Sequence, residues 1–169
     1  MTSIIKVDTI QTSAGGTPTA SSLGISGTGK IGQVIQGTTS TSVSSSSTSY
    51  ATTGFSQTIT PSSTSSKIFI ICNINATVFR SGNYIEGLYR LYRGGSALSA
   101  EMKIGGFAAV GNSSELRFWM SPSFNLLDSP SSTSELTYEL YFRTGNGTSE
   151  TNTFCDGRES TITLMEVLA

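Results

Sequence analysis

The stretch from Lys67 to Arg80 reads KIFIICNINATVFR, and its side chains alternate with a period of two. Consecutive side chains of a β-strand point to opposite faces, so this period predicts a strand. One face carries only small or apolar residues, namely Ile68, Ile70, Cys72, Ile74, Ala76 and Val78. The opposite face carries Phe69, Ile71 and Phe79. A strand that is apolar on both faces indicates burial by another sheet or by another chain, so these three residues are candidates for an oligomer interface.

Similar patterns recur on both sides of this stretch, and no window shows apolar residues at helical spacing over more than two turns. Strands are expected over 31–39, 50–60, 85–91, 116–127, 136–143 and 161–168, with a hydroxyl-rich loop at 42–49. Turns are expected at Arg93-Gly94-Gly95 and Gly145-Asn146-Gly147, and the break between Leu164 and Met165 predicts a bulge. About eight strands at this spacing predict an all-β protein, an antiparallel β-sandwich of jelly-roll type.

The first 30 residues differ in composition from the rest, so we expect two zones, an extended N-terminal arm over 1–30 and a β-sandwich body over 31–169. Glycine and small hydroxyl residues fill most of the arm and cannot bury a core of their own. One interpretation is a solvated tail. The other is an anchor to a larger assembly, which we favour because Ile4, Ile5, Val7 and Ile10 are too apolar for a purely solvated segment.

Charge is sparse along the chain, at 12% of 169 residues with a formal net charge of -1. Nucleic-acid binding needs clustered Lys and Arg, and the 10 basic residues here are scattered, so neither nucleic acid nor an anionic membrane is an expected partner. The start of the chain lacks the pattern of a secretory signal, and no apolar run approaches the ~20 residues of a membrane helix. We therefore expect folding in a reducing cytoplasm, with Cys72 and Cys155 as free thiols.

The sequence offers no catalytic, cofactor-binding or metal site, so we expect a protein that is not an enzyme. The chain has no histidine, the commonest general base and metal ligand. Residues 24–30 resemble a phosphate-binding loop, but Ile31 stands where Ser or Thr should hold magnesium, and no helix is expected to follow. Glu135 and Glu139 share one strand face and do not form the paired carboxylates of a glycosidase, while Asp128 before Ser129-Pro130 is expected to shape a turn.

Aromatic residues on the outward faces of the predicted strands carry the remaining functional signal. Trp119 faces away from Phe118 and Met120, and Tyr84 and Tyr92 face away from the apolar side of their strand. Such residues fill a second sheet's core, form an oligomer interface or stack on sugar rings. The sequence leaves these three alternatives open.

Several phrases of the sequence resemble small virion proteins of tailed bacteriophages, especially those of cyanophages and marine phages. They are IKVDTIQT (residues 5–12), YATTGF with ITPSSTSSKI (50–55 and 59–68), LYRG (91–94), LDSP with TY (127–130 and 137–138) and STITLME (160–166). The resemblance implies a structural component of the virion, a tail fibre or appendage that is assembled in the host cytoplasm. It gives no catalytic residues to carry over. Longer relatives have an extended shaft after the first phrase, and this chain lacks one.

We therefore expect a viral tail protein whose arm docks to the tail, baseplate or neck of the virion. By analogy with phage fibres, the body is expected to form a homotrimeric knob that serves host attachment. Two alternatives stay open, a capsid decoration (cement) protein and a module that binds host surface polysaccharide. The sequence does not distinguish a fibre from a decoration protein, because both roles need the same chemistry.

Overall fold

The computed structural model describes residues 11, 15–16, 29–80, 84–108, 116–145 and 150–169, and every regular element in them is a β-strand. The strands are β1 (Ile31–Thr39), β2 (Val43–Ser45), β3 (Ala51–Ile59), β4 (Lys67–Asn73), β5 (Ala76–Arg80), β6 (Tyr84–Arg93), β7 (Ser96–Ala97), β8 (Met102–Ala108), β9 (Leu116–Met120), β10 (Ser123–Asp128), β11 (Leu136–Thr144), β12 (Glu150–Phe154) and β13 (Ser160–Val167). All pairings between them are antiparallel, for example β1 with β13, β13 with β4, and β4 with β10.

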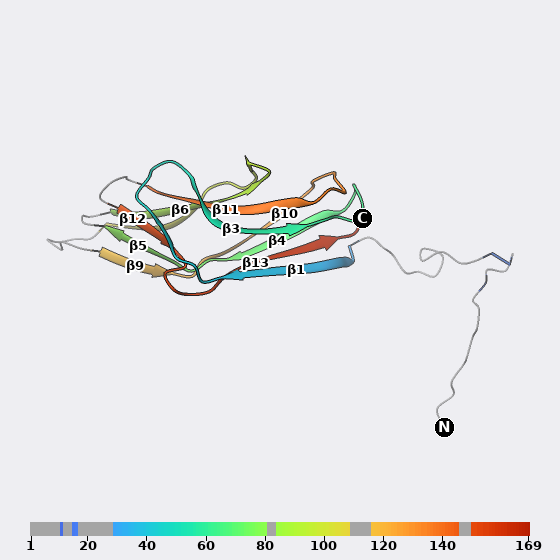
Figure 1. The fold of residues 1–169 in the computed structure, drawn as a ribbon, viewed down its shortest axis with the longest axis horizontal. Helices are drawn as coiled ribbons and strands as arrows, with labels where there is room; N and C mark the ends of the chain where they lie inside the picture. Colours follow the sequence, from blue (N-terminus) through green and yellow to red (C-terminus); the bar gives the residue numbers. More distant parts are fainter. Residues whose placement is uncertain (1–10, 12–14, 17–28, 81–83, 109–115, 146–149) are drawn as a thin grey trace, which may run out of the picture.

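The strands form two layers (Figure 1). One layer consists of the arm-end sheet, in the order β1-β13-β4-β10, and the far-end sheet, in the order β2-β12-β5-β9. Each strand of the far-end sheet is next in the chain to the strand at the same position of the arm-end sheet: β2 to β1, β12 to β13, β5 to β4 and β9 to β10. The far-end sheet therefore continues the arm-end sheet. The other layer is the facing sheet, in the order β3-β11-β6, with β7 and β8 both paired to β6. When the broken strands are counted as single ones, this is the strand order of a jelly roll, which confirms the predicted antiparallel sandwich.

The long strands of the first layer are interrupted along a common line, and here the sequence prediction was wrong in detail. Residues 67–80 form two strands in two sheets, and so do residues 116–128. Backbone groups at the break are bonded elsewhere: the Ile74 N–H donates to the Pro122 carbonyl at 2.9 Å, and the Cys155 N–H donates to the Asn75 carbonyl at 2.7 Å. Pro122 itself has no N–H to offer a ladder, which accounts for the gap between β9 and β10.

The side-chain alternation continues across the break, so the predicted inner face is correct. Ile68, Ile70, Cys72, Ile74, Ala76 and Val78 are all at most 1% exposed. They pack against Tyr138, Leu140 and Phe142 of the facing sheet, which alternate as predicted. A hydrogen bond from the Tyr89 hydroxyl to Asn152 Oδ1, at 2.9 Å, joins the two layers within the core.

Other local predictions need correction. β13 keeps a continuous register with β4 through residues 161–167, so no bulge separates Leu164 from Met165. Register shifts occur instead in the β1–β13 pair, between Ile31 and Val34, and in the β3–β11 and β6–β8 pairs. The expected loop at 42–49 contains the short strand β2, and strands β7, β8 and β12 were not predicted. In the expected turn at 145–147 only Gly145 lies within the described residues; its N–H donates to the Glu86 carbonyl at 2.9 Å.

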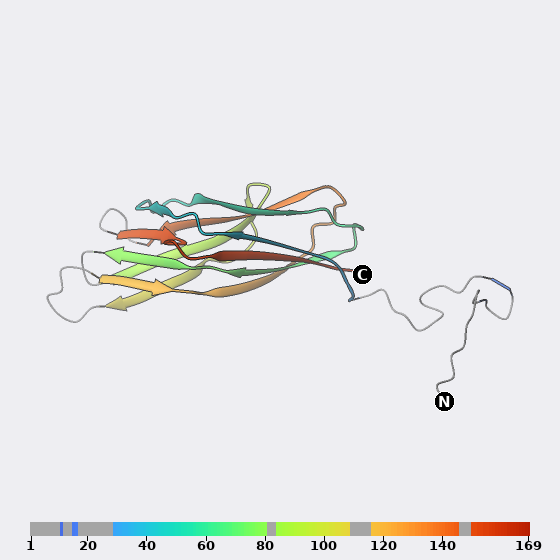
Figure 2. The ribbon, with the colours of Figure 1, turned by 60° about the horizontal axis from the view of Figure 1, so that its bottom comes forward.

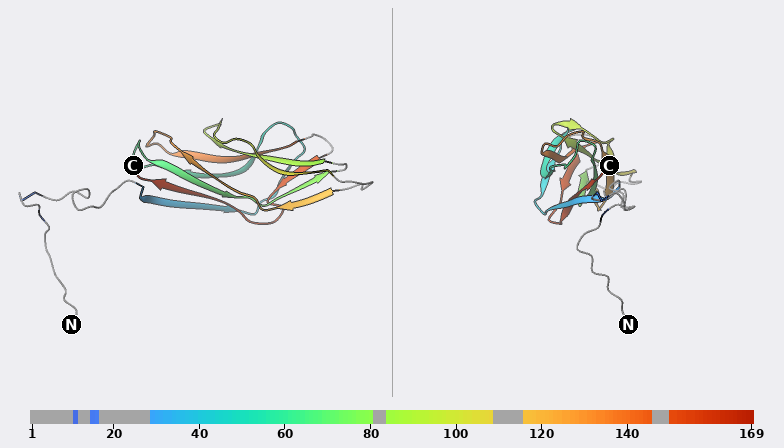
Figure 3. Two further views of the ribbon diagram at one scale, coloured as in Figure 1. Left: turned by 180° about the vertical axis from the view of Figure 1, so that it is seen from behind. Right: turned by 90° about the vertical axis from the view of Figure 1, so that its right-hand side faces the viewer.

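The start of β1 and the C-terminus lie at the same end of the elongated body (Figure 2). Gly29 N–H donates to the Leu168 carbonyl at 2.6 Å, and Leu168 N–H donates to the Lys30 carbonyl at 2.8 Å, which extends the β1–β13 ladder. Seen from behind and along its axis, the body is longer along the strands than across them (Figure 3). The division into an arm over 1–30 and a body over 31–169 stays a prediction, because most of residues 1–30 lie outside the described part.

A buried carboxylate fastens the arm end of the body. Glu166 of β13 is 2% exposed. Its Oε1 accepts from the Ser62 N–H and hydroxyl, each at 2.7 Å, and its Oε2 accepts from Gln33 Nε2 at 2.8 Å. Burial raises the pKa of this carboxyl, but the hydrogen bonds from Ser62 and Gln33 outweigh burial and lower the pKa to about 2. Glu166 therefore links β13 to β1 and to the connection between β3 and β4.

Candidate functional site

The residues predicted from the sequence as site candidates fall into separate groups in the structure. The proposed anchoring residues Ile4, Ile5, Val7 and Ile10 lie outside the described residues. Tyr84 is the first residue of β6, and its side chain also lies outside them. The others, Phe69, Ile71, Phe79, Tyr92 and Trp119, all lie on outer faces of the sandwich, but not on a single surface.

An apolar row crosses the outer face of the arm-end sheet from edge to edge. Val34 pairs with Met165, Met165 with Phe69, and Phe69 with Leu127, so the four side chains lie side by side on all four strands. Val34 is 56% exposed and Leu127 is 50% exposed. Ile71 lies in the next register position of β4, between Thr163 and Asn125, and is half-buried. The structure thus places the predicted Phe69 and Ile71 together on one outer face; their role at an interface stays a prediction.

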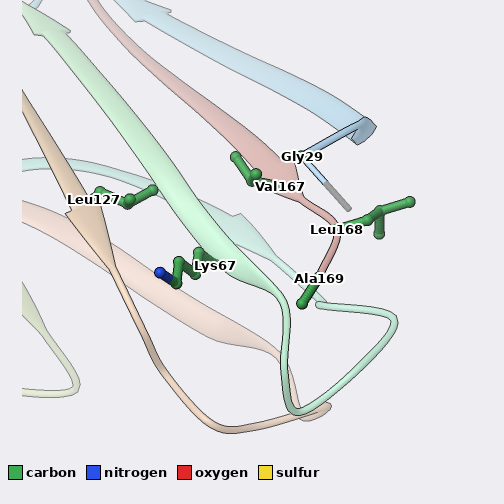
Figure 4. Close-up of a pocket in the computed structure, with 6 residues that line it drawn as sticks. All are labelled: Gly29, Lys67, Leu127, Val167, Leu168 and Ala169. Carbon is green, nitrogen blue, oxygen red and sulfur yellow. The ribbon is translucent and has the colours of Figure 1, made fainter. Parts of the chain in front are cut away.

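A hollow of about 300 Å³ adjoins the apolar row at the end where the described chain enters β1. It is lined by Gly29, Lys67, Leu127, Val167, Leu168 and Ala169 (Figure 4). Leu127 belongs both to the row and to the hollow, and Gly29 is the point at which the described chain enters β1. The apolar surface and the root of the predicted arm are therefore continuous.

A second group lies on the outer face of the far-end sheet. Phe79 of β5 pairs with Arg117 of β9, and Trp119 follows two residues later on the same face. The Arg117 guanidinium carbon is 5.6 Å from the centre of the Phe79 ring and 5.9 Å from that of Trp119. Both distances lie within the range of cation–π attraction. Trp119 is 55% exposed, so no second sheet of the same chain covers it in the described part.

The third group lies on the outer face of the facing sheet, and we call it the tyrosine–arginine cluster. It consists of Tyr50, Arg90, Tyr92, Glu101, Tyr141 and Arg143. The ring centres of Tyr92 and Tyr141 are 4.1 Å apart, and those of Tyr50 and Tyr92 are 6.3 Å apart. The guanidinium carbons of Arg90 and Arg143 lie 4.9 Å and 5.3 Å from the centre of the Tyr50 ring.

A carboxylate bridges the two arginines of this cluster. Glu101 Oε1 accepts from Arg143 Nη2 at 2.9 Å and lies 3.6 Å from Arg90 Nη2. The hydrogen bond from Arg143 lowers the pKa of the Glu101 carboxyl, and burial raises the pKa of the Tyr50 hydroxyl. Side-chain exposure is 27% for Arg90, 20% for Arg143 and 35% for Glu101, so solvent reaches all three.

Of the residues in this cluster, only Tyr92 was predicted from the sequence as a site residue. The sequence does contain a pattern that could have indicated the cluster. On two strands the positions that alternate with the core residues carry Tyr and Arg, namely Arg90 and Tyr92 on β6 and Tyr141 and Arg143 on β11. The register that brings them together, with Tyr141 opposite Arg90, could not be read from the sequence. Tyr50 and Glu101 lie just outside β3 and β8, where alternation gives no guidance.

The carboxylate of Asp128 has a different role from the expected one. Asp128 ends β10, and it accepts hydrogen bonds from Arg93 and, at 2.7 Å, from the Tyr138 hydroxyl. It thereby ties the arm-end sheet to β6 and β11 of the facing sheet instead of shaping a turn. The Glu139 carboxylate accepts from the Thr52 hydroxyl on the neighbouring strand.

Metal ligands do not converge in the described part of the chain. Within those residues no cluster of three or more Asp, Glu and Cys side chains could hold a metal ion, and no helix is long and apolar enough to cross a membrane. Both cysteines are buried, and burial raises the pKa of the Cys72 thiol to about 12. That the protein is not an enzyme stays a prediction.

Comparison with known proteins adds a distant structural similarity. No family model matches the chain, and no curated protein matches it. Among solved structures, T=1 particles derived from infectious bursal virus match with a TM-score of 0.36 and 14% identity, over 81% of this chain and 36% of that one. The VP2 subviral particle of infectious bursal disease virus matches with a TM-score of 0.37 and 15% identity, over 81% of this chain and 38% of that one. The chain thus spans little more than a third of the length of these proteins.

Proposed function

We propose that this protein is a structural component of a bacteriophage virion, a tail-fibre-type appendage whose jelly-roll body associates with copies of itself. The observation that carries the proposal is the exposed apolar row on the arm-end sheet, next to the root of the arm. The phrases of the sequence that resemble phage appendage proteins support the same function. In this proposal the body forms a homotrimer and the arm over 1–30 attaches it to the tail, baseplate or neck.

Burial of the apolar row contributes to self-association but does not account for it alone. Full burial of a Val, Leu, Phe or Met side chain contributes about 1.5–3 kcal/mol, and these side chains are already partly covered. The row therefore supplies a few kcal/mol per copy, against an association cost of at least about 4 kcal/mol. Row contacts alone give weak association, so neighbouring outer-face residues, and the arms that leave beside them, must contribute as well.

Self-association through the apolar row would also strengthen anchoring by the arms. Because the row adjoins Gly29, copies that meet through it bring their arm roots close together. Several arms held together bind a repetitive virion surface with higher avidity than a single arm does. The proposed trimer and the proposed anchor thus reinforce each other.

The self-association surface is tested by sedimentation of the full chain over a range of concentrations, for the wild type and for a double variant, Val34→Lys with Leu127→Lys. Both positions are half exposed, so the variant should fold, and the introduced charges should oppose burial. Thr137→Lys, at an exposed position on the outer face of β11, is the matched control. We expect oligomers for the wild type and the control and a monomer for the double variant. A wild type that is monomeric throughout would refute self-association.

The anchoring role is tested separately in virus particles. A chain without residues 1–20 keeps every described strand, so its body should fold and associate as before. We expect it to be absent from purified virions, whereas the full chain is present. Incorporation of the shortened chain would show that the arm is not the anchor. Immunogold labelling of the particles with full chain locates the protein, and label spread over the capsid would favour the decoration role instead of a tail appendage.

A further inference from the structure

The tyrosine–arginine cluster contains an uncommon concentration of unpaired polar atoms. In the described part of the chain three buried side-chain polar atoms have no hydrogen-bond partner, and two of them, the Tyr50 hydroxyl and Arg90 Nε, lie in this cluster. The third, Ser66 Oγ, lies in the connection between β3 and β4. Leaving a buried donor or acceptor unpaired costs about 1–3 kcal/mol, so native proteins rarely keep such groups without a reason. A ligand that bonds to both groups would remove this cost.

The cluster also shows what kind of group its arginines hold. The guanidinium groups of Arg90 and Arg143 approach the same oxygen of Glu101, at 3.6 Å and 2.9 Å. Arginine pairs suit carboxylates because their planar donors match two oxygens. Glu101 immediately precedes β8, and its side chain is 35% exposed. Glu101 is therefore a partly exposed carboxylate held between two arginines.

We propose that the tyrosine–arginine cluster binds a carboxylated saccharide. The sugar's carboxylate takes the place of Glu101 between the two arginines. Its hydroxyl groups bond to the Tyr50 hydroxyl and to Arg90 Nε, and its ring packs against the outside of the Tyr92–Tyr141 ring pair. Aromatic faces with a few convergent polar groups are the usual composition of such sites. A neutral saccharide has no group to replace Glu101 and binds more weakly.

This site is separate from the proposed self-association surface. The cluster lies on the facing sheet, whereas the apolar row lies on the outer face of the opposite layer (Figure 1). Association through the row leaves the cluster open on each copy. The inference adds host-glycan recognition to the proposed structural role and does not depend on the trimer.

The test is calorimetric titration of the full chain with a trimer of galacturonic acid, with a trimer of galactose as the neutral comparison and inorganic phosphate as a non-sugar anion. We expect binding of the galacturonic acid trimer, and binding of the galactose trimer weaker by about tenfold or more. Equal affinity for the two trimers, affinity for phosphate alone, or no binding at all would overturn the proposal.

Variants separate a binding site from a purely structural cluster. Tyr50→Phe removes a buried hydroxyl that has no hydrogen-bond partner at good geometry, so it should preserve the fold and weaken binding of the galacturonic acid trimer. Glu101→Gln removes the competing charge and should strengthen binding severalfold, an effect that loss of a structural contact would not produce. Arg117→Gln, on the other layer, should change nothing. Weaker binding in Glu101→Gln, or unchanged binding in Tyr50→Phe, would count against the proposal. Sedimentation of the same samples reports self-association independently, so the two proposals can fail separately.

Discussion

Replacement of the buried carboxylate of Glu166 should destabilise the protein strongly at neutral pH and hardly at all in acid. The carboxyl has a pKa of about 2 in the folded protein against an ordinary value of 4.5, and this difference corresponds to about 3 kcal/mol of stability. Because the folded-state pKa is depressed, the contribution is complete above pH 4.5 and is lost as the pH falls towards about 2. Typical domains unfold with about 5–15 kcal/mol, so this one group supplies a large share.

Glu166→Gln is the variant that isolates the charge. The amide keeps the size of the side chain but turns an NH₂ group towards Gln33 Nε2, a donor facing a donor. Gln33 cannot simply rotate its amide, because Nε2 also donates to the Thr60 carbonyl at 2.7 Å. We therefore expect the free energy of unfolding at pH 7 to fall by about 3 kcal/mol, the loss expected when a charged acceptor is removed from buried donors.

The assay is urea unfolding of the wild type and of Glu166→Gln at several pH values between neutral and strongly acid. Glu135→Gln, at an exposed position before β11, controls for the loss of one negative charge. The gap between wild type and Glu166→Gln should narrow steadily below the ordinary pKa of the carboxyl. A gap that is the same at neutral and acid pH would refute the reasoning, since the effect would then come from shape and not from charge. The reasoning would also be refuted if Glu166→Gln and the control Glu135→Gln lowered the free energy of unfolding by the same amount.

Three further predictions concern the fold. Ile70→Ala should lower the free energy of unfolding by about 2–5 kcal/mol, because it leaves a cavity in the core. Ile71→Ala, on the outer face of the same strand, should lower it by less than about 1 kcal/mol. Equal losses of stability in urea unfolding would contradict the assignment of faces. Gly157→Ala should lower the free energy of unfolding by about 1 kcal/mol, because Gly157 has a φ of +75°, which alanine disfavours. Nothing lies within 4 Å of the new methyl group, so a steric clash does not add to this loss. An unchanged thermal midpoint would show that this turn adjusts freely. Cys72, fully buried and with a pKa raised to about 12, should react with a thiol reagent only as fast as the protein opens, so rapid labelling of the native protein would place it at the surface.

Much of the sandwich could be predicted from the sequence, because strand alternation is a local property. The inner face that begins at Ile68 and the face of β11 are visible as a period of two, and both proved to be buried. The positions of strand breaks were not predictable in the same way. The break at Ile74–Asn75 depends on bonds to Pro122 and Cys155, which are distant in the sequence, so no local pattern marks it.

For the candidate sites too, one part could be predicted from the sequence and another part could not. The sequence alone determined that Phe69 and Ile71 share the face opposite Ile68, because the parity of a residue in a strand fixes its face. It left open whether a second sheet covers that face, and it left the same question open for Trp119. Only the tertiary structure decided what lies beside them: the register of four strands aligns Val34, Met165, Phe69 and Leu127 into one row. It likewise assembles the tyrosine–arginine cluster from β6 and β11 and from residues next to β3 and β8. The physical reason is that the face to which a side chain points is set by its position within one strand. The register is set by hydrogen bonds between strands, and many of these strands are far apart in the sequence.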